Sequence, residues 1–287
     1  MTTIRRADTA GFCIKKKKKK KKLDKLVEAD KGSSRIYTFG PIIHNPQVLN
    51  RYAQKGVLQA SALTDIQEPG QVIIRAHGIP LSEQKKLESM QLKIVDATCP
   101  KVKKAQLLIA EQTQRKRHLL LFGEPEHPEV QGLLSYSDSK ALVFSSLDEL
   151  QKLQLDHSEA YFLAAQTTQN RKEFREILNY LQTNLDPEIP VCDTICDTTR
   201  KRQEEALQIA REVDIMVVVG GYTSGNTRRL VQVVREQNVP AIHVEEALEL
   251  AVDDLKDKHK IGLTAGASTP KDIIDAVQEK IESMLKA

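Results

Sequence analysis

Short apolar runs of strand length alternate along the chain with longer stretches of helical period. Three of these runs end at a glycine, and they are RIYTFG (35–40), HLLLFG (118–123) and DIMVVVGG (214–221). A second set of strand-like runs follows farther along, at 72–78, 160–168 and 260–268. Each run has the length of a buried strand, and the helical stretches between them indicate crossovers. Helix and strand in alternation predict parallel sheets in an α/β fold.

The same plan recurs after each of three cysteines. Cys99 is followed directly by a helical pattern over 100–114, Cys196 by one over 197–213, and Cys13 by a lysine run and then LDKLVEAD. The cysteines are 86 and 97 residues apart, which is one copy of the plan each. We therefore predict three similar α/β units with small parallel sheets, arranged with pseudo-threefold symmetry around a central site. Their expected bounds are 1–98, 99–195 and 196–287. The competing interpretation is three unrelated α/β lobes with incidental cysteines.

The composition is that of an ordinary globular protein, with 40% hydrophobic and 29% charged residues. No apolar run nears the roughly 18 residues that span a bilayer. Arg5 and Arg6 are not followed by the apolar segment of a signal peptide, so we expect a cytoplasmic protein without a membrane partner. The net charge of +4 depends on Lys15 to Lys22, because without them Lys plus Arg falls from 43 to 35 against 39 acids. The remainder has no general nucleic-acid character.

The cysteines are the first candidates for chemistry, since four of them without a secretory signal favour metal or catalytic roles over disulfides. Pro100 is favoured at the first helical position, so Cys99 is expected at a helix N-cap, where free N–H groups stabilise a thiolate. Cys196 also precedes a helical run. Three thiolates leave one iron of a four-iron cluster without a protein ligand, and an open position is the mark of a catalytic metal site.

Other interpretations of the cysteines stay open at this point. Any one of them alone could be a small buried hydrophobe. Cys192 lies four residues before Cys196 and could be a fourth ligand, but it has no equivalent in the other copies and we interpret it as a spare thiol. Zinc is a further option, although the long spacings do not resemble those of structural zinc sites.

Polar side chains gather in the loops that follow the strands, which is where parallel sheets bind ligands. Three Xaa-Pro pairs in these loops are typical of an N-cap followed by a first-turn proline: Asn45-Pro46, His127-Pro128 and Thr269-Pro270. Helix N-termini with polar neighbours form anion sites that suit a phosphate or diphosphate. The candidate ligand-binding residues are His44, His77, His127, Ser224, Asn226 and Ser268.

Glu129 is the acid directly after the proline of the His127 loop. Partial burial would raise the pKa of a carboxyl there and make it a proton donor. The alternative is a first-turn glutamate that complements the helix dipole. The sequence chemistry alone favours neither.

The motifs together resemble a known family, 4-hydroxy-3-methylbut-2-enyl diphosphate reductase, the last enzyme of the non-mevalonate isoprenoid route. Nearly the whole chain is covered by these motifs, which occur in order: G-F-C (11–13), H-N (44–45), A-H-G (76–78), D-A-T-C-P (96–100), H-P-E-V (127–130), Q-T-T (166–168), S-G-N-T (224–227) and T-A-G-A-S (264–268).

The resemblance implies a set of roles. A [4Fe-4S] cluster would be held by Cys13, Cys99 and Cys196, and the diphosphate by His44, His77, His127, Ser224, Asn226 and Ser268. Glu129 would deliver protons, with Thr167 and His127 beside it in the catalytic group, and Thr167 would also bind the substrate by helping to order its hydroxyl and the water. Two electrons from a ferredoxin- or flavodoxin-type donor and two protons would remove the allylic hydroxyl as water. The products would be isopentenyl and dimethylallyl diphosphates.

The chain departs from the family pattern at two places. Some relatives have two serines before the asparagine, where this chain has Ser224-Gly225, so one phosphate contact is lost while close backbone approach is kept. After Cys13, an expected apolar helix face is replaced by Lys15 to Lys22. Three explanations compete, namely an erroneous stretch of recorded sequence, a deliberate change, and a natural anion-binding adaptation. The alternative function is therefore a non-catalytic iron–sulfur or anion-binding relative that the lysine run disables.

Overall fold

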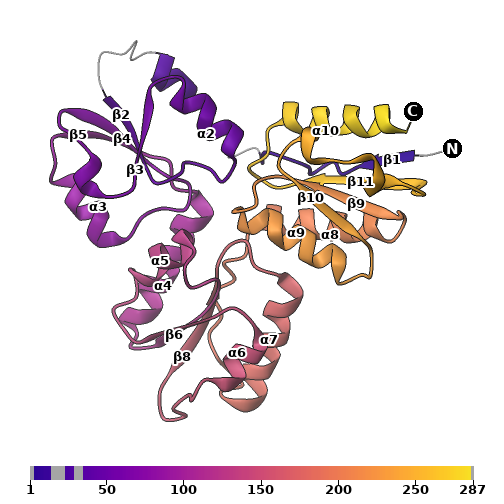
Figure 1. Cartoon of the computed structure of the whole chain (residues 1–287). Coiled ribbons are helices and arrows are strands. Elements are labelled where there is room, and N and C mark those ends of the chain that lie inside the picture. Colours follow the sequence, from indigo (N-terminus) through magenta and orange to yellow (C-terminus); the bar gives the residue numbers. More distant parts are fainter. Residues whose placement is uncertain (1–2, 14–22, 29–34, 286–287) are drawn as a thin grey trace. The chain divides into compact units, whose positions relative to one another are not determined.

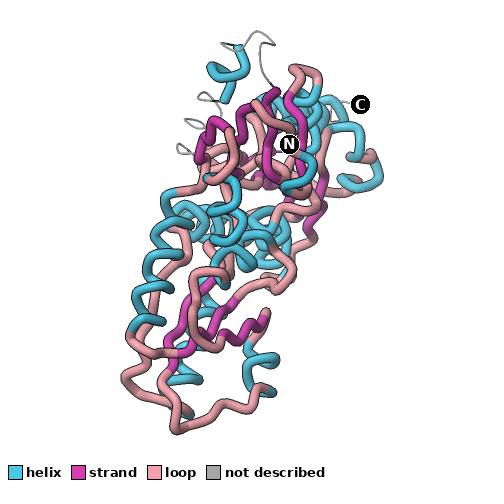
Figure 2. The backbone as a smooth tube through the Cα atoms, turned by 90° about the vertical axis from the view of Figure 1, so that its left-hand side faces the viewer, coloured by secondary structure: helices cyan, strands magenta, loops and turns pink. Residues whose placement is uncertain are grey.

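The computed structural model describes residues 3–13, 23–28 and 35–285 (Figure 1). The expectations for Lys15 to Lys22 lie outside these ranges. The chain divides into two compact bodies. Body 1 contains Met1–Lys31, Ile43–Lys55 and Asp197–Ala287, and body 2 contains Gly32–Ile42 and Gly56–Cys196. Each body is described by itself. Figure 2 shows the same backbone with its helices and strands distinguished by colour.

Body 1 is built around one parallel sheet with the strand order β1-β11-β9-β10. Its strands are β1 (Thr3–Arg6), β9 (Ile215–Val219), β10 (Ala241–Val244) and β11 (Lys260–Ala265). Its helices are α2 (Pro46–Ala53), α8 (Asp197–Ala210), α9 (Gly225–Arg235) and α10 (Lys271–Met284), with short 3-10 turns η2 (Ala247–Glu249) and η3 (Val252–Leu255). Residues 23–28 are also helical. Successive side chains of β9 point to opposite faces and enter two separate cores, one with α10 and one with α8 and α9.

Body 2 contains two parallel sheets, β3-β2-β4-β5 and β7-β6-β8. The strands of the first are β2 (Arg35–Phe39), β3 (Val57–Ala60), β4 (Gly70–Ile74) and β5 (Leu92–Asp96). Those of the second are β6 (His118–Phe122), β7 (Ala141–Phe144) and β8 (Tyr161–Ala165). The helices are α3 (Leu81–Glu88), α4 (Pro100–Gln114), α5 (Pro128–Leu134), α6 (Leu147–Lys152) and α7 (Arg171–Asn184), with the 3-10 turn η1 (Leu63–Asp65). The second sheet is buried on both faces.

The three sheets share one topology, which confirms the predicted α/β fold of similar units. In each sheet the first strand of the repeat lies in the middle, the second on one side and the third on the other. The three equivalent orders are β3-β2-β4, β7-β6-β8 and β10-β9-β11. All pairings are parallel, as expected for strands joined through helices on one or both faces.

A further segment adds to the outer side of the third strand in each sheet, and each such segment precedes a cysteine. β5 pairs with β4 before Cys99, and Val191 forms an isolated parallel bridge with Leu163 of β8 before Cys196. β1 precedes Cys13 and pairs with β11 near the other end of the chain. β1 is part of the expected first unit, 1–98, and its partner β11 is part of the expected third unit, 196–287. The expected boundaries of the three units stay predictions.

Local sequence patterns predicted several of the longer helices, with bounds that can be compared with the structure. α4 has the predicted bounds 100–114, with Cys99 as N-cap and Pro100 at the first position. The pattern after Cys196 extends to Val213, but α8 ends at Ala210. The predicted N-cap at Thr269 is wrong, since α10 begins at Lys271 after Pro270 and the Thr269 hydroxyl donates to the carbonyl of Val219 instead. None of the helices in the described ranges is long and apolar enough to cross a membrane.

Candidate active site

The three predicted cluster ligands each follow an equivalent hydrogen-bonded anchor, formed by a backbone N–H in two copies and by a threonine hydroxyl in the third. The residue two positions before each cysteine is hydrogen-bonded to the last residue of the neighbouring third strand. Gly11 N–H donates to Ala265 O at 3.3 Å, and Ala97 N–H donates to Ile74 O at 3.0 Å. At the third position the Thr194 hydroxyl both donates to Ala165 O and accepts from Ala165 N–H, the latter at 2.8 Å. Cys13, Cys99 and Cys196 therefore follow equivalent anchors at the carboxyl ends of three sheets.

Two of the cysteines in body 2 have further backbone contacts. Cys99 N–H donates to Ala76 O at 2.8 Å, and Cys196 N–H donates to Thr167 O at 2.9 Å. Cys99 caps α4, and Cys196 directly precedes α8. Both thiols and that of Cys13 are partly exposed and not in disulfides. Partly exposed thiols at helix starts suit thiolate ligation.

Cys192 differs from the other three cysteines in its burial and its surroundings. It is 4% exposed and packs in the apolar core beside Ala105, Ile109 and Phe162. Burial raises the pKa of its thiol to about 11. A thiol held protonated in an apolar core is a poor metal ligand, which supports its interpretation as a spare thiol.

Glu129 and Thr167 lie together in the buried part of body 2. Glu129 is 1% exposed and lies in the first turn of α5, and Thr167 is 6% exposed after the end of β8. The Thr167 N–H donates to Glu129 Oε1 at 2.6 Å and its hydroxyl donates to Oε2 at 3.0 Å. Because Cys196 N–H is bonded to the carbonyl of the same threonine, one residue links the carboxylate to a predicted cluster ligand.

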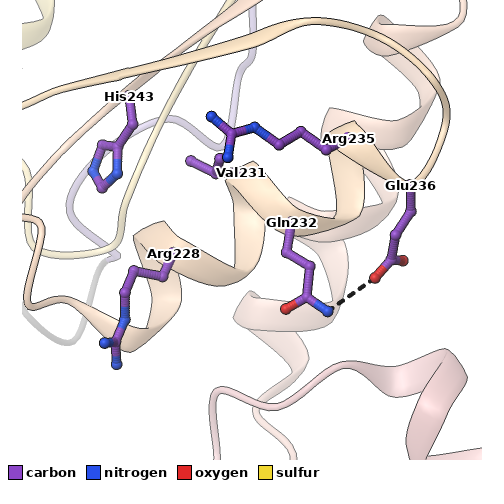
Figure 3. Close-up of a pocket in the computed structure, with 6 residues that line it drawn as sticks. All are labelled: Arg228, Val231, Gln232, Arg235, Glu236 and His243. Atoms are coloured by element: carbon purple, nitrogen blue, oxygen red, sulfur yellow. Dashed lines mark hydrogen bonds between the residues drawn. The ribbon is translucent and has the colours of Figure 1, made fainter.

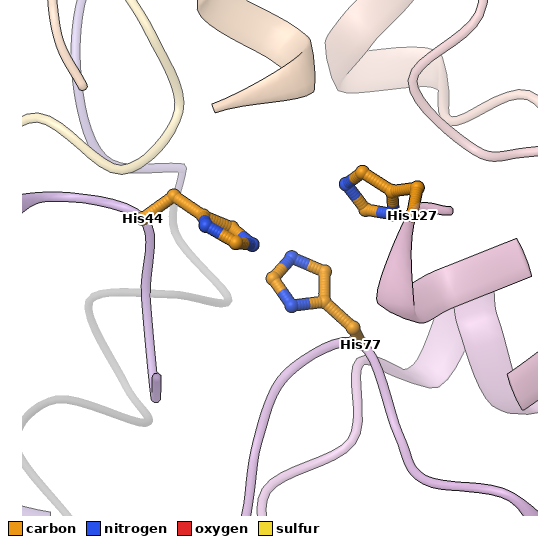
Figure 4. A group of neighbouring side chains, drawn as sticks. All are labelled: His44, His77 and His127. Atoms are coloured by element: carbon orange, nitrogen blue, oxygen red, sulfur yellow. The ribbon is translucent and has the colours of Figure 1, made fainter. Parts of the chain in front are cut away.

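His127 caps α5 as predicted, through its ring. Its Nδ1 accepts from Glu129 N–H at 3.1 Å, so the neutral ring carries its proton on Nε2. The rings of His77 and His127 meet edge to face with centroids 5.4 Å apart (Figure 4). His44, which Figure 4 also labels, belongs to body 1. Body 2 thus brings together two predicted diphosphate ligands and the predicted acid.

Body 1 gathers the remaining predicted ligand-binding residues at the loops after β9 and β11. Ser268 Oγ donates to His44 O at 3.2 Å and lies 3.4 Å from Ser224 Oγ. A Cβ added to Gly221 would lie 2.5 Å from His44 O, so only glycine allows this approach. Ser224 is the N-cap of α9 and accepts from Thr227 N–H. The loops of His44, Ser224 and Ser268 therefore meet at one helix start.

Asn226 lies in the first turn of α9 and is 6% exposed. Its amide Nδ2 is buried and has no hydrogen-bond partner among the described residues. The hydroxyl of Thr227, beside it, is buried and unpartnered in the same way. Buried donors normally have partners, because leaving one unpaired is costly. A donor of this kind in the first turn of a helix has the chemistry that an anionic acceptor requires.

The sequence pattern missed Thr194 and the pairing of Asn45. Thr194 lies two residues before Cys196, and comparing the three copies at that position would have found it. Asn45 was predicted as an N-cap, and its Oδ1 does accept from Val48 N–H at 3.0 Å. Its 0% exposed side chain also leaves Nδ2 without a partner among the described residues.

A hollow of about 550 Å³ lies along α9 and β10 of body 1 (Figure 3). Its lining residues are Arg228, Val231, Gln232, Arg235, Glu236 and His243. Most of these side chains are exposed, and Gln232 donates to Glu236 across the helix turn at 3.0 Å. None of the predicted site residues lines it, so it is distinct from the candidate site.

Fold and site together define an α/β protein with three parallel sheets of common topology and an equivalently anchored cysteine after each. A model of the LytB protein family matches residues 4–282. The chain therefore belongs to the LytB protein family.

Several curated relatives carry one name. The chain is 55% identical over 282 residues to the 4-hydroxy-3-methylbut-2-enyl diphosphate reductase of Nitratidesulfovibrio vulgaris (strain DSM 19637 / Miyazaki F), covering 97% of this chain and 99% of the relative. It is 39% identical over 283 residues to the protein of the same name from Clostridioides difficile (strain 630), covering 98% and 99%.

Solved structures agree. The (E)-1-hydroxy-2-methyl-but-2-enyl-4-diphosphate reductase from Plasmodium falciparum matches with a TM-score of 0.90 at 25% identity, covering 100% of this chain and 88% of that one. A second structure, described as the terminal enzyme of the non-mevalonate pathway, matches with a TM-score of 0.66 at 38% identity, covering 99% of this chain and 100% of that one.

Proposed function

We propose that this chain is a reductase that converts (E)-4-hydroxy-3-methylbut-2-enyl diphosphate to isopentenyl and dimethylallyl diphosphates. The observation that carries the proposal is 55% identity, over nearly the full length of both chains, to an enzyme of that name. The reaction consumes two electrons and two protons. The allylic C–O bond breaks, the oxygen leaves as water, and one proton is added to the allylic carbon skeleton.

Cys13, Cys99 and Cys196 are the residues that would hold a [4Fe-4S] cluster. Their equivalent hydrogen-bonded anchors and partly exposed thiols fit three-thiolate ligation, and three thiolates leave one iron without a protein ligand. When bound, the cluster would supply the electrons of the reduction.

The diphosphate is assigned to polar groups of both bodies. In body 1 these are His44, Ser224, Asn226 and Ser268, and in body 2 they are His77 and His127. The unpartnered Nδ2 of Asn226 supports the assignment, because a phosphate oxygen would satisfy it. With Nδ1 occupied by a backbone N–H, His127 has its Nε2–H to donate to an anion.

The proton is assigned to Glu129. Its two hydrogen bonds from Thr167 hold both carboxylate oxygens in one orientation, which is a requirement for positioned proton transfer. The hydroxyl of Thr167 can also accept a hydrogen bond while it donates to Glu129, so it is placed to orient the leaving hydroxyl. Thr167 thus belongs with Glu129 and His127 in the catalytic group.

The electrons would come from a ferredoxin- or flavodoxin-type protein in the cytoplasm. A one-electron carrier suits the reaction, because an iron–sulfur cluster would take up one electron at a time and the reduction needs two. The donor is the one partner of the proposal that is itself a protein.

Anaerobic reconstitution tests the proposal. We expect the purified chain to bind close to four irons and to reduce the diphosphate with a chemical reductant. A Cys196→Ser variant that kept the full cluster would overturn the three-thiolate assignment.

The lysine run favours one alternative, a non-catalytic relative in which Lys15 to Lys22 disable the site. The matched variant replaces this run with an apolar-faced helix sequence. If only that variant becomes brown and active, the alternative holds for the chain as it stands. If both versions bind iron and turn over, the alternative is excluded.

A further inference from the structure

We propose that Arg202 and Glu205 of α8 are positioning residues for Cys13. They fix the backbone of the loop 8–11 and so hold the thiol of Cys13 where a cluster requires it. This inference rests on the proposed cluster of three thiolates and goes beyond it, because neither residue belongs to a recognised motif of the site.

Arg202 is a buried cation whose donors are directed at one loop. It is 2% exposed. Its Nε and Nη2 donate to the carbonyl of Thr9 at 3.0 and 2.7 Å, and Nη2 donates also to the carbonyl of Gly11 at 2.8 Å. Nη1 contacts Thr198 O within its own helix at 3.4 Å. Burying a guanidinium costs free energy, and here the hydrogen bonds to two loop carbonyls compensate it. This use of a buried cation indicates that the positions of the two carbonyls matter.

Glu205 lies almost one turn farther along α8 and holds the N–H groups of the same loop. Its Oε1 accepts from Asp8 N–H at 2.7 Å and its Oε2 from Thr9 N–H at 2.9 Å. The Thr9 hydroxyl donates to Oε2 as well. Arg202 and Glu205 therefore bind opposite polar groups of one short segment, and the backbone there is fixed in both directions.

The other side of the loop is closed by β11 and α10. Gly11 has a φ of +86°, and a Cβ added there would lie 2.7 Å from Ile274 and 2.9 Å from Thr269 O. Its N–H is bonded to Ala265 O. The loop is thus held between α8 and the end of the sheet, two residues before the thiol of Cys13, and none of these bonds involves residues 14–22.

The arrangement links two predicted ligands through one helix. α8 begins at Asp197, directly after Cys196, and its Arg202 and Glu205 hold the segment that leads to Cys13. Cluster ligation requires fixed sulfur positions, and small displacements of a site are costly. Loss of Arg202 is therefore expected to act on Cys13 selectively and to leave Cys99 unaffected.

The test compares Arg202→Met, which keeps much of the volume and removes all donors, with Arg200→Met as control. Arg200 lies on the same helix and forms an ion pair with Glu204, one turn farther along. In the metal-free protein, the rates of alkylation of Cys13 and Cys99 are measured by mass spectrometry in the same sample. We expect the ratio of Cys13 to Cys99 to rise about tenfold in Arg202→Met, as for loss of a hydrogen bond to a charged group. Arg200→Met should leave it unchanged.

Two further variants guard against a folding defect. Glu205→Gln keeps the shape of the side chain and should raise the same ratio less than Arg202→Met does. Arg202→Lys keeps the charge without the planar fork and should restore the ratio only in part. After reconstitution, Arg202→Met and Glu205→Gln should hold less iron per chain than Arg200→Met, and the electron paramagnetic resonance signal of the remaining cluster should change.

An unchanged Cys13 to Cys99 ratio in folded Arg202→Met and Glu205→Gln would overturn the inference. The thiol measurement needs no metal, so it tests the role of Arg202 even if the wild-type chain binds no iron. In that case the proposed cluster function fails while the positioning of Cys13 is still decided.

Discussion

The carboxylate of Glu129 accepts two hydrogen bonds from Thr167, one from the backbone N–H at 2.6 Å and one from the hydroxyl at 3.0 Å. Thr167 in turn accepts from the N–H of Cys196 through its carbonyl. The predicted acid is thereby connected through one residue to a predicted cluster ligand. Substitutions of Glu129 or Cys196 should therefore lower the turnover rate more than they lower the stability of the fold.

Glu129→Gln should abolish most of the turnover while substrate still binds. The amide has the shape of the carboxyl and can keep hydrogen bonds with Thr167, but it cannot deliver a proton. Positioned acid catalysis is worth roughly 100- to 10,000-fold, and the loss in kcat should lie in this range. Glu126→Gln, an exposed acid in the same loop, is the control and should behave as wild type. Equal loss in both variants would show that the loop, and not the acid, is responsible.

Thr167→Val removes the hydroxyl and keeps the backbone N–H bond to Glu129. A hydrogen bond to a charged group is worth about 1.5–3 kcal/mol, so kcat should fall roughly ten- to hundredfold. Thr167→Ser restores the hydroxyl and should recover most of the activity. Steady-state kinetics on the three proteins would contradict the assignment if serine and valine were equivalent.

Asn226→Ala should weaken substrate binding with little cost in stability. Asn226 Nδ2 is buried without a partner in the described structure, so its removal relieves an unsatisfied donor. Asn170 is a matched control, since it is also 6% exposed but caps α7 through Lys172 N–H and Glu173 N–H. Asn170→Ala should cost about 1 kcal/mol of stability. Its KM should stay at the wild-type value, while that of Asn226→Ala rises.

The measurement is a thermal melt of the metal-free proteins alongside the KM of the reconstituted ones. The opposite pattern, in which Asn226→Ala melts lower than Asn170→Ala with an unchanged KM, would remove Asn226 from the diphosphate site.

Cys192→Ala should leave the iron content unchanged, because the thiol lies in the apolar core and not at a cysteine anchor. Its pKa of about 11 exceeds the ordinary value of 9.0, so the folded state keeps a proton that the unfolded chain releases. Stability from this group is therefore present below about pH 9 and declines as pH rises toward 11. Unfolding of the metal-free protein between these pH values should be less pH-dependent in Cys192→Ala. A loss of one quarter of the iron would instead make Cys192 a ligand.

The local pattern of apolar residues was enough to predict the three α/β units and the bounds of several helices and strands. α4 begins and ends where the pattern of Cys99 and Pro100 predicts, because a capping residue, a first-turn proline and an apolar face agree there. The sequence did not indicate β3, β5, β7 and β10, because their side chains are only partly buried and give a weaker apolar signal than the fully buried strands β4, β8 and β9. The partner of β1 lies more than 250 residues away, and no local signal encodes such a pairing.

The candidate site also has some features that the sequence predicts and others that only the folded structure shows. The motifs supplied its residues, and the repeat supplied the equivalence of the cysteines. Contacts such as Glu129 with Thr167, or Arg202 with Thr9, join residues far apart in sequence and depend on how strands and helices pack. The sequence indicates Asn226 only by its place in a polar loop. The structure adds that its amide Nδ2 is buried without a partner among the described residues.

The pairing of β1 with β11 sets the order in which the molecule can be completed. During synthesis the residues of β1 leave the ribosome well before their partner strand, Lys260–Ala265, which lies more than 250 residues farther along the chain. Arg202, Glu205 and the Ala265 carbonyl that hold the Cys13 loop also arrive late. A nascent chain can fold the sheets of Cys99 and Cys196 before then, yet it cannot fix its first cysteine. Assembly of the proposed cluster would therefore have to follow the synthesis of β11, and a chain that stalls before Lys260 would lack the contacts that hold the Cys13 loop.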